Sequence, residues 1–184
     1  MVQVIFVRHG EPDYSDVSAR GFIGHGQDMA QLTEKGKAQA LAAAKDDRLE
    51  GVELILSSPY TRALQTAAII SRCRGMDLHV ETDLHEWLPD LNHAYTGMEA
   101  KKEIFQRFAK NKGVCPEDSP IRYEAYQNVF DRVNACLQKH LFRQKIAVVT
   151  HALVIAAFCY PAHTPWGGIV EFEFSDNMKW RGWG

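Results

Sequence analysis

The apolar positions of this chain gather in short runs that are separated by longer amphipathic stretches. The runs predict strands at residues 2–7, 53–56, 77–82, 145–150 and 169–174. Runs with little alternation, such as 2–7, are typical of strands buried on both faces of a parallel sheet. The alternating pattern of 169–174 indicates a strand with one exposed face. The pattern therefore predicts an α/β protein.

The stretches between the runs carry helical periodicity or residues that start helices. We expect helices at about 33–49, from Ser58-Pro59 onward, at 98–112, from Ser119-Pro120 to about 142, and at 152–159. Thr33 and Ser58 are the expected N-caps. The expected buried side chains of the first helix are Ala38, Leu41, Ala42 and Leu49. Strands that alternate with helices predict a three-layer α/β/α sandwich with a mostly parallel central sheet.

Two further stretches complete the predicted organisation. Residues 12–31 are polar and show no clear period, so we expect a long loop beside the first strand. Ser175-Asp176-Asn177 predicts a turn into a last strand with Met178 and Trp180, which would form a C-terminal hairpin at the edge of the sheet. No repeat or flexible linker interrupts the pattern, so we interpret residues 1–184 as a single domain.

Composition narrows the classes of function. The 184 residues are 46% hydrophobic and 24% charged with a formal net charge of −2, which argues against a nucleic-acid partner. No apolar run reaches the length of a membrane span, and the N-terminus lacks the features of a signal peptide. The four cysteines show no metal-binding spacing. We expect a cytoplasmic protein with reduced thiols and no membrane partner.

The predicted helix at 98–112 is strongly basic on part of its surface. Its basic residues are Lys101, Lys102, Arg107, Lys110 and Lys112, against the single acid Glu103 between 101 and 112. Either these residues form a solvated helix face, or they belong to a lid that attracts an anionic substrate. Because this helix follows a polar and aromatic loop, we expect residues 87–118 to form a cap that sets specificity.

Potentially cationic side chains stand where predicted strands end and helices begin. Arg8 and His9 follow the first strand, Arg62 follows Ser58-Pro59, and His151 follows the strand at 145–150. The carboxyl ends of parallel strands open into the crevice where open α/β sheets bind ligands. Arginine donates paired hydrogen bonds to phosphate, and helix N-termini add free N–H groups. The sequence therefore predicts a site for a phosphate dianion.

These residues belong to a series of motifs that resembles the histidine phosphatase superfamily, the phosphoglycerate-mutase-like enzymes. The similar stretches are Arg8-His9-Gly10-Glu11, Leu32-Thr33 with Gly36, Gln39 and Ala40, Ser57-Ser58-Pro59 with Arg62, Ala63, Gln65, Thr66 and Ala67, Leu84 with Glu86, and Thr150-His151. They occur in the family's order and span nearly the whole chain.

The resemblance implies hydrolysis of a phosphomonoester through a phosphohistidine on His9. Arg8, Arg62 and His151 would bind the phosphoryl oxygens and neutralise their charge, so no metal or other cofactor is expected. Glu86 is the expected acid for the leaving group and base for water, with His85 as a rival proton donor. Glu11 would orient its neighbours. The expected ligand is a small phosphorylated metabolite.

One departure and two alternatives bear on this interpretation. The residue after the second histidine is Ala152, where the family usually has glycine; its backbone N–H can still bind phosphate unless a positive φ is required. A bisphosphoglycerate-dependent mutase would return the phosphoryl group to substrate instead of water. A non-catalytic module that binds a phosphoprotein or phosphorylated ligand would need neither His9 nor Glu86.

Overall fold

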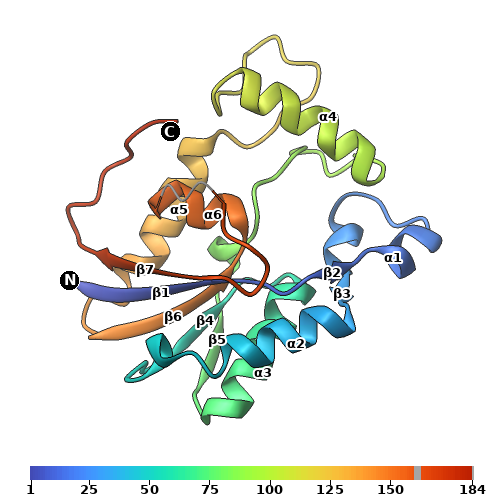
Figure 1. The fold of residues 1–184 in the computed structure, drawn as a ribbon. Helices are drawn as coiled ribbons and strands as arrows, with labels where there is room; N and C mark the ends of the chain where they lie inside the picture. Colours follow the sequence, from blue (N-terminus) through green and yellow to red (C-terminus); the bar gives the residue numbers. More distant parts are fainter. Residues whose placement is uncertain (160–162, 184) are drawn as a thin grey trace.

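The computed structural model, which describes residues 1–159 and 163–183, is built on a five-stranded sheet of order β5-β4-β6-β1-β7 (Figure 1). Its strands are β1 (Val2–Arg8), β4 (Ile55–Ser57), β5 (Leu78–Val80), β6 (Lys145–Thr150) and β7 (Ile169–Phe174). The neighbours among β5, β4, β6 and β1 pair in parallel, and only β7 pairs antiparallel, on β1. The mostly parallel α/β sheet is thus confirmed.

Successive residues of the central strands alternate between two apolar layers. Val4 and Phe6 of β1 pack into one cluster, and Ile5 and Val7 pack into the other. Each of these four side chains is fully buried. Both faces of the strand are therefore covered, which is why its sequence is a continuous apolar run.

Helices supply the two outer layers. The longer helices are α2 (Glu34–Ala43), α3 (Thr61–Arg74), α4 (Gly97–Lys110), α5 (Tyr126–Gln138) and α6 (Ala152–Cys159). In Figure 1, α2 and α3 cover one face of the sheet, and α5 and α6 cover the other. The three-layer arrangement is confirmed, and so are the helix at 152–159 and the N-cap Thr33, whose Oγ accepts the Gly36 N–H at 2.9 Å.

Short elements replace the long loop that was expected at 12–31. They are β2 (Pro12–Asp13), α1 (Ser15–Ala19), the 3₁₀ helix η1 (Gly24–Met29) and β3 (Gln31–Leu32), and β2 pairs with β3. Two further 3₁₀ helices are η2 (Asp47–Leu49) and η3 (Thr82–Leu84). Elements of two to six residues are too short to show a hydrophobic period, which is why the sequence did not reveal them.

Three helix predictions were wrong in detail. α3 begins at Thr61 rather than Pro59, because the Ser58 hydroxyl contacts His151 Nε2 and the Tyr60 N–H instead of capping a helix that starts at Pro59. α5 begins at Tyr126, since the Ser119 hydroxyl donates to the nearby Ile121 carbonyl rather than starting a helix, and it ends at Gln138. α2 ends at Ala43 and buries Gly36, Ala40 and Ala43, whereas Ala38, Leu41 and Ala42 are exposed.

The predicted C-terminal hairpin is also absent. The turn after β7 forms, with Met178 N–H donating to Ser175 O, but residues 178–183 make no strand. Trp180 instead packs against Tyr126, with ring centroids 5.1 Å apart, and Trp183 packs against Phe108 at 5.1 Å. Burial of these two large rings above α5 draws the tail away from the sheet edge.

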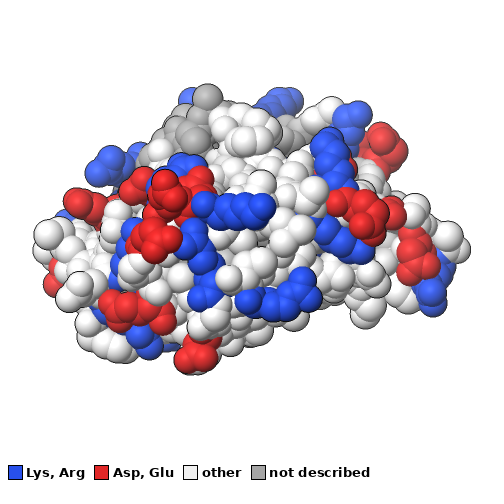
Figure 2. All heavy atoms as spheres, turned by 60° about the horizontal axis from the view of Figure 1, so that its bottom comes forward, with Lys and Arg blue, Asp and Glu red and all other residues white. Residues whose placement is uncertain are grey.

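Segment 87–118 lies beyond the α5 and α6 side of the sheet, where α4 is its main element (Figure 1). Trp87 and Phe108 are buried with ring centroids 4.5 Å apart, which anchors α4 to the core. On the opposite face, shown in Figure 2, basic and acidic side chains are interspersed without a patch of one sign. No helix in the described residues is long and apolar enough to cross a membrane.

The turn after β1 packs backbone against backbone on the first turn of α2. A Cβ at Gly36 would lie 2.3 Å from Glu11 O, and one at Gly10 would lie 2.3 Å from Gly36 O. We expect Gly36→Ala to lower the free energy of unfolding by about 1–3 kcal/mol in urea titrations, because the turn must shift to admit the methyl group. Ala38→Ser, at an exposed position of the same helix, should change it by less than about 0.5 kcal/mol. Equal stability of both variants would contradict this packing.

Candidate active site

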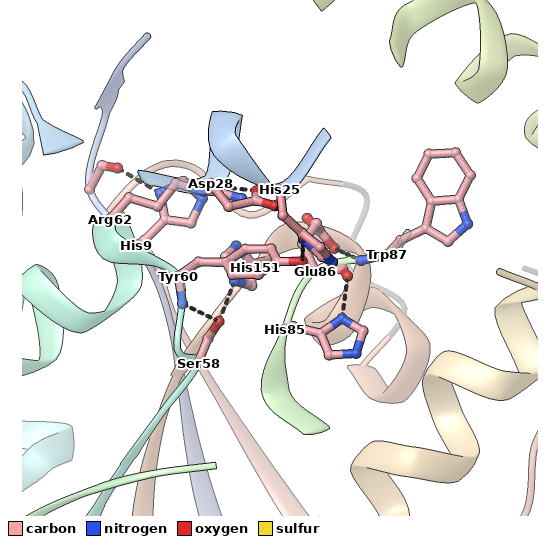
Figure 3. Close-up of polar contacts among 11 residues, drawn as sticks. His9, His25, Asp28, Ser58, Tyr60, Arg62, His85, Glu86, Trp87 and His151 are labelled. Carbon is pink, nitrogen blue, oxygen red and sulfur yellow. Dashed lines mark hydrogen bonds and ion pairs between the residues drawn. The ribbon is translucent and has the colours of Figure 1, made fainter. Parts of the chain in front are cut away.

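The predicted cationic residues meet at the carboxyl ends of the parallel strands, and Figure 3 shows three of them, His9, Arg62 and His151. Arg8 ends β1 and His9 follows it, His151 follows β6, and Arg62 lies in the first turn of α3 after β4. Pairing of Arg8 with Thr150 sets the two histidines side by side, with ring centroids 5.1 Å apart. Parallel register thus brings together residues that are far apart in sequence.

His9 is held in one orientation and one tautomer. Its Nδ1 lies 2.7 Å from Gly10 O, and since a carbonyl oxygen only accepts, Nδ1 carries the proton and Nε2 keeps its lone pair. The turn itself is fixed by the Gly10 N–H, which donates to Thr66 Oγ1 at 3.1 Å. Burial, and then the nearby Arg62, hold the pKa of His9 well below its usual range. The ring is therefore a neutral imidazole with a free Nε2 at neutral pH.

His151 is fully buried and is positioned by Ser58. Ser58 Oγ accepts the Tyr60 N–H at 3.3 Å and lies 2.8 Å from His151 Nε2, so its own hydrogen is free to donate to that nitrogen. With Ser58 as the donor, the ring proton of His151 lies on Nδ1, which has no hydrogen-bond partner among the described residues. Burial, and then Arg62, lower the pKa of His151 well below its usual value. His151 offers the site a neutral N–H donor.

Arg62 is 2% exposed and is held by Asp28 from η1. Its Nη1 lies 3.2 Å from Asp28 Oδ1, and its guanidinium stands 5.0 Å from the centre of the Tyr60 ring. Burial alone would lower the pKa of Arg62, but Tyr14 and Asp28, together with Glu86, raise it above its usual value. The guanidinium is therefore a fixed positive charge.

Arg8 is held in place by contacts with Thr164 and Trp166. Its Nη1 donates to Thr164 O, and its guanidinium lies 5.6 Å from the centre of the Trp166 ring. Arg8 Nε and Arg62 Nε are both buried without a hydrogen-bond partner among the described residues. Buried donors without partners are costly, so these two atoms, together with His151 Nδ1, could hold an anionic ligand such as phosphate.

Glu86 projects from the loop after η3 toward this cluster (Figure 3). Its Oε1 accepts the Trp87 N–H at 2.9 Å, and its charge acts on Arg8 and Arg62. The rival donor His85 has its pKa lowered by burial and then by Arg132, so it lacks the extra proton at neutral pH. His85 Nδ1 also donates its hydrogen to the Glu86 carbonyl oxygen at 2.7 Å, so the Glu86 carboxyl is the acidic group that faces the cluster.

Ala152 is compatible with phosphate binding at the start of α6. In the described residues, the only residues other than glycine with positive φ are His93 and Lys112, so Ala152 adopts a backbone that any residue can take. Its N–H belongs to the first turn of an eight-residue helix and has no carbonyl partner within that helix. The departure from glycine therefore leaves this donor in place.

Sequence reasoning missed Lys101, which α4 directs toward the site. Burial, and then Arg62, lower the pKa of Lys101, and its charge helps to lower the pKa of both His9 and His151. Lys101 is half-buried, whereas the other four basic residues of 101–112 are exposed. Most charges of this helix are therefore solvated, and the lid that attracts an anionic substrate stays a prediction that now depends on Lys101.

We expect Lys101→Met to weaken competitive inhibition by inorganic phosphate about fivefold, since it removes roughly 1 kcal/mol of attraction at a partly screened distance. The control is Lys110→Met, which removes an exposed cation at the other end of α4. Its inhibition constant for phosphate should differ less than twofold from that of the unchanged protein. Identical constants for the two variants would show that Lys101 does not contribute to the field of the site.

Sequence reasoning also left His25 and His93 unassigned. Their rings stack with centroids 3.9 Å apart, and His25 Nδ1 lies 3.1 Å from Asp28 Oδ2. Gly24, at φ 51°, packs so closely on the His93 carbonyl that a Cβ would lie 1.9 Å from that oxygen. These contacts close the side of the site around Tyr60.

Glu11 lies farther out, where Lys35 and Thr33 bind its carboxylate and lower its pKa.

Comparisons with known proteins agree with this geometry. The profile of the histidine phosphatase superfamily (branch 1) matches residues 4–181. The chain is 30% identical over 161 residues to wheat (Triticum aestivum) 2-carboxy-D-arabinitol-1-phosphatase, covering 83% of this chain and 30% of that protein. It is 32% identical over 143 residues to the "probable phosphoglycerate mutase GpmB" of Escherichia coli, covering 75% of this chain and 62% of that one.

Among solved structures, native mycobacterial glucosyl-3-phosphoglycerate phosphatase has a TM-score of 0.64 and 24% identity. The likeness covers 84% of this chain and 76% of that one, and it establishes the shared fold. In the described residues, no group of three or more histidine, cysteine or acidic side chains is placed to hold a metal ion.

Proposed function

The chain belongs to branch 1 of the histidine phosphatase superfamily, and from that premise we propose that it hydrolyses phosphate monoesters through a phosphohistidine on His9. The observation that carries the proposal is the state of His9. Its proton is fixed on Nδ1 by Gly10 O, and its pKa is held low, so Nε2 is a free nucleophile at neutral pH.

In the first step, the Nε2 lone pair of His9 attacks phosphorus while the bond from phosphorus to the ester oxygen breaks. Glu86 gives its proton to that oxygen, so the alcohol leaves neutral. In the second step, the Glu86 carboxylate accepts a proton from water, and the water oxygen attacks phosphorus. The P–N bond breaks, inorganic phosphate forms, and both residues return to their initial states.

The remaining groups of the site would stabilise the negative charge of the phosphoryl group during its transfer. Arg8 and Arg62 offer their unpartnered Nε atoms, His151 offers Nδ1–H, and Ala152 offers its backbone N–H. Fixed donors of this kind supply most of the catalysis of phosphoryl transfer. Because Arg62 is held by Asp28 and Arg8 by Thr164, the donors are preorganised before substrate binds.

Since side chains would supply all the charge, we propose that the enzyme needs no metal or other cofactor. Phosphate release from 4-nitrophenyl phosphate should proceed at the same rate in buffer with excess EDTA. Restoration of an EDTA-inactivated enzyme by a divalent cation would overturn this part of the proposal.

The four cysteines are free thiols, which agrees with a cytoplasmic location.

The 32% sequence identity to the probable phosphoglycerate mutase GpmB supports mutase activity as a second candidate function. A mutase would pass the phosphoryl group from His9 back to a phosphoglycerate. With 3-phosphoglycerate as substrate, phosphatase action releases inorganic phosphate, whereas mutase action yields 2-phosphoglycerate without release. The names of the other relatives favour hydrolysis of small phosphorylated metabolites.

A further inference from the structure

An apolar cavity of about 200 Å³ opens beside Glu86, under helix α4. Its lining residues are Glu86, Trp87, Met98, Lys101, Lys102, Phe105 and Leu153. Glu86 is the proposed acid, and Leu153 is the second residue of α6, close to His151. The cavity is therefore continuous with the site and begins at the group that would protonate the leaving oxygen.

The walls of this cavity are fixed by contacts outside it. Trp87 is buried, and its Nε1–H donates to Glu124 O at 2.7 Å. α4 is anchored by Ile104 and Phe108, which are buried in the core. Trp87 and the backbone of α4 are thus held in place by packing outside the cavity.

Two large apolar side chains of α4 stay exposed at the mouth of the cavity. Met98 is 45% exposed and Phe105 is 40% exposed, and the Phe105 ring centroid lies 6.0 Å from that of Trp87. Grouped exposed apolar side chains beside a set of polar groups are typical of a ligand site.

A second pocket at the site, formed by described residues, is more polar and offers less space. It is lined by His25, Asp28, Tyr60, His93 and other residues around the histidine stack, and it has no room for a water molecule. Lys101 lines both pockets and stands between them. A leaving group that starts at Glu86 therefore has space on the apolar side of Lys101.

We propose that this cavity binds the leaving group, and that the preferred substrates are phosphate monoesters whose alcohol carries an aromatic ring or branched alkyl group. The proposal rests on the proposed hydrolysis at His9. A cavity of this volume holds one ring-sized group, and Phe105 and Met98 in its lining would contact that group.

The test compares 2-phenylethyl phosphate with ethyl phosphate, because their alcohols are similarly poor leaving groups and differ in the ring alone. We expect kcat/KM to be at least about tenfold higher for the phenyl ester. Phe105→Ala and Met98→Ala should each lower this ratio at least about threefold. Phe142→Ala, an exposed residue before β6 at the opposite end of the sheet, should leave the ratio unchanged.

A ratio near one in the intact protein, or a high ratio that both α4 variants retain, would overturn the subsite. If neither ester is hydrolysed, the proposed function fails, and the subsite is tested by ligand binding instead. The dissociation constants of 3-phenylpropylphosphonate and propylphosphonate, which resemble the two esters, are then compared in place of kcat/KM. A preference of at least about tenfold for the phenyl compound that falls in Phe105→Ala supports the cavity, and equal constants refute it.

Discussion

His9→Ala should abolish phosphatase activity, with a loss of at least about 10⁴-fold in kcat for any phosphate ester. Among the described residues, the variant removes the atom that the geometry offers as nucleophile, since His151 Nε2 is engaged by Ser58 Oγ. The cationic cluster remains, so phosphate binding should persist. Phosphate release from 4-nitrophenyl phosphate measures the rate, and calorimetry measures phosphate affinity.

The matched control is His25→Ala, which removes an imidazole that lines the polar pocket and takes no part in the proposed chemistry. We expect His25→Ala to lose far less phosphatase activity than His9→Ala. Retention of more than about one hundredth of the activity by His9→Ala would show that another group attacks phosphorus or that water attacks directly.

Glu86→Gln should produce a loss that depends on the leaving group. For an alkyl ester, the departing oxygen needs a proton in the transition state, and we expect kcat to fall about 10²–10⁴-fold. For 4-nitrophenyl phosphate, the anion leaves without help, so the first step should be nearly normal. The second step still lacks its base, so a burst of nitrophenol should precede a slow steady rate.

Glutamine keeps the shape of the side chain but can neither give nor accept the proton. His85→Gln tests the rival donor, and it should lower the alkyl-ester rate less than about tenfold, because the lowered pKa of His85 leaves it unprotonated at neutral pH. If His85→Gln instead shows the dependence on leaving group, the acid is His85 and Glu86 has another role.

The cationic part of the site could be predicted from sequence because it depends on local rules. Arg8, His9 and His151 each follow an apolar strand, and parallel strands place such residues at one edge. Arg62 follows the same logic in the first turn of a helix. Nothing beyond element order was needed to bring these residues together.

The residues that hold the site in shape could not be predicted in this way. Asp28 reaches Arg62 from a six-residue 3₁₀ helix, and its approach depends on how Gly24 packs on His93. Lys101 looked like its basic neighbours, and only the docking of α4 against Trp87 directs it inward. Long-range packing of this kind leaves no local pattern in the sequence.

Two errors in the fold have equally specific causes. Ser58-Pro59 has the composition of a helix start, yet Ser58 binds His151 and the helix begins at Thr61, so a functional contact overrode a local preference. In α2, alanines occupy both faces, and the helix buries the small residues Gly36, Ala40 and Ala43 instead of the larger Leu41. Small residues give a weak hydrophobic period.

The measurement that tests the account most directly is the capture of the phosphorylated enzyme. Glu86→Gln protein mixed with 4-nitrophenyl phosphate and quenched in alkali should carry one phosphoryl group, because its second step is slow. Peptide mass spectrometry should place that group on His9, and acid should remove it. A phosphoryl group on another residue, or a burst of nitrophenol with no phosphorylated protein, would contradict a phosphohistidine on His9.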